Sequence, residues 1–266
     1  MHESDLKPMT VGEIVSTAVQ IYWTRFGLLL RLVAIFILPV EIVYAIVISE
    51  SSGSRTNVLS ELLVVATGQL ATAACFKAVS DEFLGQRSSW RSAMDFVWRR
   101  SGQVLVLAVV EVVLVGAGFL LFIVPGIYLL VALLLATPAL LLEDLRPVNA
   151  LQRSRMLTQG MWFRTAGCYL LASLFVFFVA LIPTLLFIHV TGAGSTASSS
   201  DPVAADIASV VTSLLTTPFM ATVVVLIYYD LRVRKERLSI DELARSLRID
   251  PSTVDRTRFE RPDDSV

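Results

Sequence analysis

Long apolar stretches without charged residues alternate along this chain with shorter segments that are rich in arginine. No Asp, Glu, Lys or Arg lies between Val112 and Leu142, or between Thr165 and Ser200. A helix needs about 20 apolar residues to cross the roughly 30 Å hydrocarbon core of a bilayer, and each stretch is longer than that. The pattern predicts an all-α integral membrane fold with six transmembrane helices, at about 26–48, 58–80, 103–124, 127–143, 165–190 and 207–229.

The basic segments between these helices predict their orientation. Four arginines lie in segment 85–102, and four more lie in segment 144–164. Because an excess of Lys and Arg marks cytoplasmic loops, two spans must separate these segments. Pro125-Gly126 is then the outer turn, since proline ends a helix and glycine allows a sharp reversal. The basic run after Asp230 puts both termini in the cytoplasm.

Composition agrees with a polytopic membrane protein. The 266 residues are 55% hydrophobic and 17% charged, whereas soluble domains are about 25% charged. The net charge of −1 and the pI near 6.1 argue against a nucleic-acid partner. Cys75 and Cys168 lie in apolar stretches, so we expect buried thiols rather than a disulfide.

A W-x-R motif precedes each odd-numbered span, and each copy follows an amphipathic stretch. Thr10 and Glu13 form a capping box at the start of the first stretch, and Pro147 begins the third. We therefore predict three internal repeats, at about 9–84, 88–143 and 147–230. Each repeat would be a cytoplasmic interfacial helix followed by a transmembrane hairpin.

The W-x-R residues have two interpretations. Tryptophan prefers the headgroup depth, and arginine extends towards lipid phosphate. The motif is therefore either a site for anionic lipid headgroups or a general interfacial anchor. The residues concerned are Trp23, Arg25, Trp98, Arg100, Trp162 and Arg164.

Five polar residues inside the predicted spans are candidates for a functional site, because an ionisable group at membrane depth normally faces the bundle interior and has a partner. We expect Glu111 to pair with Arg31 or Lys77, and Glu41 to form a hydrogen bond with Gln69. Such pairs would either join helices or line a pathway through the membrane.

Catalytic and metal-binding patterns are absent from the sequence. The two histidines, His2 and His189, lie far apart, and no nucleotide-binding loop occurs. We expect no enzyme activity and no cofactor. Residues 1–245 form the predicted membrane domain. Ser239 and Glu242 cap a predicted short helix over 240–248, and the tail 246–266 is predicted to be disordered.

The chain resembles the membrane domain associated with bacterial glycerophosphoryl diester phosphodiesterases and the related YciC-like membrane proteins, most of all the actinobacterial members. The stretches that carry the resemblance are TVGEI (10–14), IYW (21–23), IVPGIY (123–128), PALLLE (138–143), ALQRSRMLT (150–158) and YYDLRVRK (228–235). The resemblance implies a helical membrane module without the hydrolase domain, so it transfers no catalytic residue.

Two functions fit these observations. The first is a non-enzymatic scaffold or regulatory module that acts at the cytoplasmic face and contacts anionic lipid or a protein partner. The alternative is a transporter or exporter of a small or lipid-like substrate, with a pathway between the repeats near Glu41, Lys77 and Glu111.

Overall fold

The computed structural model describes residues 9–50, 58–83, 89–191 and 202–236, and within these ranges it contains helices and no strands. The predicted helix over 240–248 and the tail 246–266 lie outside the described residues. The helices are α1 (Val11–Thr24), α2 (Phe26–Glu50), α3 (Val58–Phe83), α4 (Trp90–Leu121), α5 (Ile123–Leu133), α6 (Ala136–Leu142), α7 (Pro147–Thr158), α8 (Trp162–Thr191) and α9 (Pro202–Glu236).

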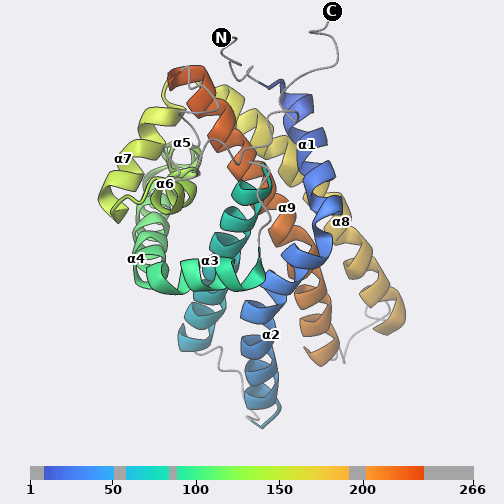
Figure 1. The fold of residues 1–266 in the computed structure, drawn as a ribbon. Coiled ribbons are helices and arrows are strands. Elements are labelled where there is room, and N and C mark those ends of the chain that lie inside the picture. Colours follow the sequence, from blue (N-terminus) through green and yellow to red (C-terminus); the bar gives the residue numbers. More distant parts are fainter. Residues whose placement is uncertain (1–8, 51–57, 84–88, 192–201, 237–266) are drawn as a thin grey trace, which may run out of the picture.

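Six segments of the described chain are long and apolar enough to cross a membrane, which confirms the predicted number of spans. They are α2, α3, α4, the α5–α6 pair, α8 and α9. The most extensive contacts join α2 to α3, α4 to α5, and α8 to α9. The start of α1 and the end of α9 lie at the same end of the molecule (Figure 1).

Helix α9 is the central element of this bundle, because α1, α2, α3 and α8 all pack against it. Its segment 221–232 is buried along its whole length, including Tyr228 and Tyr229. A helix that is buried all round normally carries apolar residues on every face. The charged residues Asp230 and Arg232 in this segment therefore need partners inside the protein.

The predicted capping box at the start of α1 is confirmed. The Thr10 hydroxyl accepts a hydrogen bond from the Glu13 N–H at 3.3 Å, and the Glu13 carboxylate accepts one from the Thr10 N–H at 2.6 Å. Helix α1 then buries Ile14 and Ala18 on its apolar face. It ends at Thr24, and Arg25 leaves the helical conformation before α2 begins.

The second predicted interfacial helix is continuous with the span that follows it. Trp98 and Arg100 lie in the middle of α4, which runs without interruption for 32 residues. Between α7 and α8, by contrast, Gly160 adopts φ +79°, which separates the two helices. The second stretch contains no such break. Its glycine, Gly102, lies within α4.

The predicted outer turn is also misplaced. The chain reverses at Phe122, which is extended, with φ −163° and ψ 157°. Pro125 lies in the first turn of α5, where a missing N–H breaks no helical hydrogen bond. Gly126 is instead a packing residue, because a Cβ there would lie 2.5 Å from the Cγ of Phe119 on α4.

This close approach predicts that Gly126→Ala destabilises the α4–α5 pair. The added methyl group would clash with the Cγ of Phe119, so the ring has to move. Overpacking of this kind lowers the free energy of unfolding by about 1–3 kcal/mol. Thermal unfolding of the purified protein in detergent should show a lower Tm. The matched control is Gly116→Ala on α4, where a Cβ meets no atom within 4 Å. Equal Tm values for the two variants would contradict this account.

Candidate functional site

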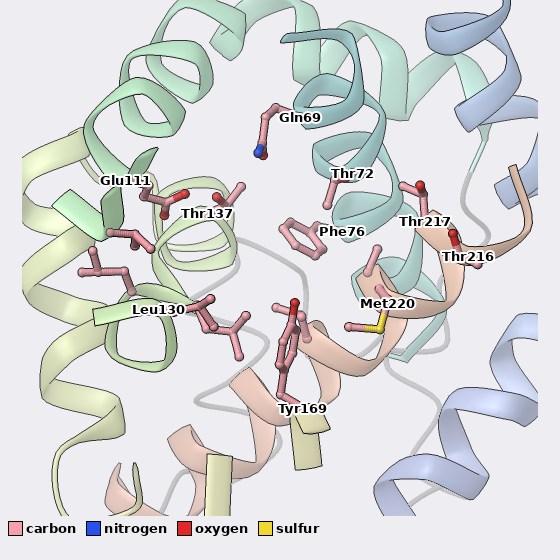
Figure 2. Close-up of a pocket in the computed structure, with 15 residues that line it drawn as sticks. Gln69, Thr72, Phe76, Glu111, Leu130, Thr137, Tyr169, Thr216, Thr217 and Met220 are labelled. Atoms are coloured by element: carbon pink, nitrogen blue, oxygen red, sulfur yellow. The ribbon is translucent and has the colours of Figure 1, made fainter. Parts of the chain in front are cut away.

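A cavity of about 470 Å³ lies between the helices of the three predicted repeats (Figure 2). Helix α3 contributes to its wall from the first repeat, and α4, α5 and α6 contribute from the second. Helices α8 and α9 contribute from the third. Binding sites for small molecules typically have volumes of about 300–1,000 Å³, so the cavity is large enough for a ligand.

Polar side chains from several helices point into this cavity. Figure 2 shows Gln69 of α3 and Glu111 of α4 facing the hydroxyl group of Thr137 on α6. Thr217 of α9 lies on the opposite side. Within the described part of the chain, these four side chains form no hydrogen bond with protein. Their hydrogen-bonding capacity is therefore available to a ligand or to water.

The rest of the wall is apolar or aromatic. Phe76 of α3 and Tyr169 of α8 lie between the polar groups, with Leu130 and Met220 beside them (Figure 2). A few polar groups within a mainly apolar lining is the usual composition of a small-molecule site.

A break in the fourth span forms one side of the cavity. Pro138 has no N–H to donate to the Leu134 carbonyl, and Leu135 leaves the helical conformation with φ −97° and ψ 7°. The predicted single helix over 127–143 is therefore two helices, α5 and α6. The buried Ser154 of α7 stabilises this break. Its hydroxyl donates to the Ala132 carbonyl at 2.7 Å and accepts from the Leu135 N–H at 3.1 Å.

A second proline lies beside the opposite wall. Pro218 interrupts the hydrogen-bond ladder of α9 directly after Thr217. One turn away, the Tyr22 hydroxyl of α1 donates to the Leu215 carbonyl at 3.1 Å. Burial raises the pKa of Tyr22 above its ordinary value, which keeps this hydroxyl protonated and able to donate. Neighbouring side chains commonly satisfy backbone groups near a proline in this way.

Two of the five predicted intramembrane polar residues, Gln69 and Glu111, line the cavity. The predicted pairs are wrong. Lys77 instead forms an ion pair with Asp81 one turn along α3, and Arg31 is exposed on α2. In the described residues neither basic group contacts Glu111, and no hydrogen bond joins Gln69 to Glu41.

The W-x-R arginines form ion pairs inside the protein. Each one binds an acidic residue near or just beyond the end of its own predicted repeat. The pairs are Arg25 with Glu82 at 2.6 Å, Arg100 with Asp144 at 2.7 Å, and Arg164 with Asp230 at 3.0 Å. An Arg–acid ion pair therefore recurs beside each of the three pairs of spans. Because these guanidinium groups bind carboxylates, fewer of their donors remain for lipid phosphate.

The three tryptophans have different environments. Trp23 and Trp98 are 69% and 72% exposed, as expected for interfacial anchors. Trp162 is half-buried, stacks on Tyr128 of α5, and donates a hydrogen bond to the Tyr128 carbonyl at 3.4 Å. A headgroup site at the W-x-R motif stays a prediction.

Asp230 is the centre of one charged cluster at the end of α9. Its side chain is 1% exposed and binds Arg164 and Arg234, each at 3.0 Å. It also accepts a hydrogen bond from the Met9 N–H at 2.8 Å, while both arginines donate to the Met9 carbonyl. The cluster therefore joins the segment before α1 to α8 and α9.

Glu143 is the centre of a second cluster, which joins α6, α7 and α9. Arg153 donates to its carboxylate at 2.8 Å, Tyr228 donates at 2.6 Å, and Arg232 lies 3.7 Å away. Glu236 binds both arginines. Burial alone lowers the pKa of Arg153, but the hydrogen bonds and charges of Glu143 and Glu236 outweigh it and raise that pKa.

Sequence reasoning missed Thr137, Tyr169 and Thr217 in the cavity wall. A usable signal was present, because Thr137 and Thr217 each come directly before a proline within a span. A proline there indicates irregular backbone, which is tolerated at membrane depth where it is buried or borders a cavity.

Comparison with known proteins places the chain in a family. A family model described as "Domain of unknown function (DUF7847)" matches residues 91–231, more than half of the chain. The chain belongs to this family. The part that matches the DUF7847 domain includes Glu111, Thr137, Tyr169 and Thr217, and both charged clusters are centred on residues within it. No curated protein and no solved structure matches the chain.

Asp230 generates a prediction about stability. Asp230→Asn removes a buried charge that binds two arginines, and breaking a buried pair costs about 3–5 kcal/mol. We expect a large fall in Tm in detergent. The control, Asp95→Asn, removes a 64% exposed carboxylate whose pair with Arg99 is worth about 0.2–1 kcal/mol. A Tm for Asp230→Asn equal to that of the control would show that the cluster does not hold the bundle together.

Proposed function

We propose that the protein binds a small, partly polar molecule inside the membrane and acts as its transporter or exporter. The observation that carries this proposal is the cavity at the interface of the three predicted repeats, with unpartnered polar groups from α3, α4, α6 and α9. The broken α5–α6 span supports it, since discontinuous helices form the substrate sites of many transporters. The proposal assigns no catalytic step and no cofactor.

The proposal includes the predicted membrane arrangement. The three span pairs would be hairpins in a bacterial cytoplasmic membrane, with both termini cytoplasmic and α1 and α7 in the interface. The charged clusters centred on Asp230 and Glu143 would then lie at the cytoplasmic end of the bundle, where water meets the ends of α6 and α9. The resemblance to phosphodiesterase membrane domains stays a prediction beside this proposal.

Cysteine labelling tests whether water reaches the cavity. Thr217→Cys in a background without Cys75 and Cys168 should react with a membrane-impermeant methanethiosulfonate reagent in proteoliposomes. A transporter opens its site to each side in turn, so reaction is expected from both sides. Thr222→Cys is the matched control, because this buried residue of α9 does not line the cavity. An unreactive Thr217→Cys would contradict the proposal.

A second function, that of a scaffold or regulatory module at the cytoplasmic face, has its own supporting observation. Helix α7 exposes Arg146 at its N-cap and Arg155 in its last turn, with Val148 and Met156 exposed beside them. Exposed basic and apolar residues on one helix are typical of contact with anionic lipid or with a partner helix.

This surface predicts stabilisation by an anionic lipid. Phosphatidylglycerol added to the protein in detergent should raise the Tm more than phosphatidylcholine does. Changing both Arg146 and Arg155 to Gln should reduce that difference, since each basic residue near an anionic surface contributes about 1 kcal/mol. If the double substitution leaves the Tm difference between the two lipids unchanged, α7 does not bind the anionic lipid through these arginines.

A further inference from the structure

The cavity wall contains one acidic side chain that no basic side chain of the described residues binds. Glu111 is the one residue with an ordinarily charged side chain among the fifteen described residues that line it. Its neighbours in the wall are uncharged, and within the described residues its carboxyl group forms no hydrogen bond or ion pair. The site therefore differs from the clusters centred on Asp230 and Glu143, where arginines balance each acid.

Two helices that line the cavity carry basic side chains, Lys77 on α3 and Arg100 on α4, and both bind other groups. Lys77 lies one residue beyond Phe76 but binds Asp81, with its ammonium 5.5 Å from the ring of Phe96. On Glu111's own helix, Arg100 binds Asp144 and the Leu141 carbonyl. The protein thus supplies no cation to Glu111 from these positions.

A carboxylate in a site of low dielectric is stable only if it binds a proton or meets a positive charge. The remaining lining favours a particular kind of cation. The Gln69 carbonyl and the Thr137 and Thr217 hydroxyls provide oxygens that can accept N–H donors. The rings of Phe76 and Tyr169 provide faces that attract a cation.

We propose that the molecule bound in the cavity is an organic cation, an amine or quaternary ammonium with apolar substituents, and that Glu111 is its counter-ion. This inference rests on the proposed function and adds the class of substrate. An organic anion would meet Glu111 without a basic side chain to oppose it. A metal cation would need about six oxygen ligands, whereas Leu130, Met220 and other apolar residues cover much of this wall.

Binding of tetraphenylphosphonium to the full-length protein in phosphatidylcholine nanodiscs tests the proposal. Tetraphenylborate has the same shape and the opposite charge, and empty nanodiscs measure the partitioning of both ions into lipid. We expect saturable binding of the phosphonium and none of the borate. Equal binding of both ions, or preference for the borate, would overturn the proposal without any substitution.

Variants then locate the charge. Glu111→Gln should weaken phosphonium binding by about tenfold or more, as expected for loss of a charged partner. Glu111→Asp should retain most of the affinity, and Asp95→Asn, on the exposed surface of the same helix, should leave it unchanged. Unchanged binding by a folded Glu111→Gln variant would place the cation elsewhere. If Glu111→Gln does not fold, the proposal is tested by two other results. These are the phosphonium affinity of Glu111→Asp and the preference of the unsubstituted protein for the phosphonium over the borate.

The two proposals fail in different ways. If Thr217→Cys is labelled but the protein binds both ions equally, the proposal of a water-accessible cavity stands and the proposal of an organic cation is wrong. If Thr217→Cys is not labelled, both proposals are wrong. Competition of millimolar Na⁺ or Mg²⁺ with the phosphonium at Glu111, at constant ionic strength, would show a metal-ion site and overturn the assignment to an organic cation.

Discussion

The requirement that a buried charge has a partner organises this structure. The buried carboxylates of Glu82 and Asp230 bind Arg25 and Arg164, and the more exposed Asp144 binds Arg100. An ion pair therefore closes each pair of spans at one end. Asp230 extends this arrangement, because it also holds the backbone before α1. With the bundle fixed by charge at one end, the cavity can keep polar groups that the protein leaves unsatisfied.

The spans could be predicted from sequence because their signal is local. Apolar length identifies a membrane helix, and the spacing of Thr10 and Glu13 identifies a cap. Errors arose where a residue has two roles. Pro125-Gly126 has the composition of a turn, yet Pro125 occupies the first turn of α5 and Gly126 allows contact with Phe119. Only the approach of a neighbouring helix distinguishes these roles.

The cavity could be predicted in part. Glu111 and Gln69 were identified because polar residues inside a span are unusual, and both line the wall. That neither side chain has a partner among the described residues was not predictable, since a pairing depends on how far each helix rotates about its own axis. Lys77 turns towards Asp81, one turn further along α3, and so away from Glu111. Threonine is common in membrane helices, so composition alone did not single out Thr137 or Thr217.

The hydrogen bond from the Tyr22 hydroxyl to the Leu215 carbonyl links α1 to the part of α9 that lines the cavity. Helix α1 is predicted to lie in the membrane surface, and Leu215 precedes Thr216 and Thr217, which belong to the cavity wall. A displacement of α1 along that surface would therefore act on α9 close to Pro218. The surrounding lipids would then act on the shape of the cavity through the packing of α1 on α9, which includes this hydrogen bond.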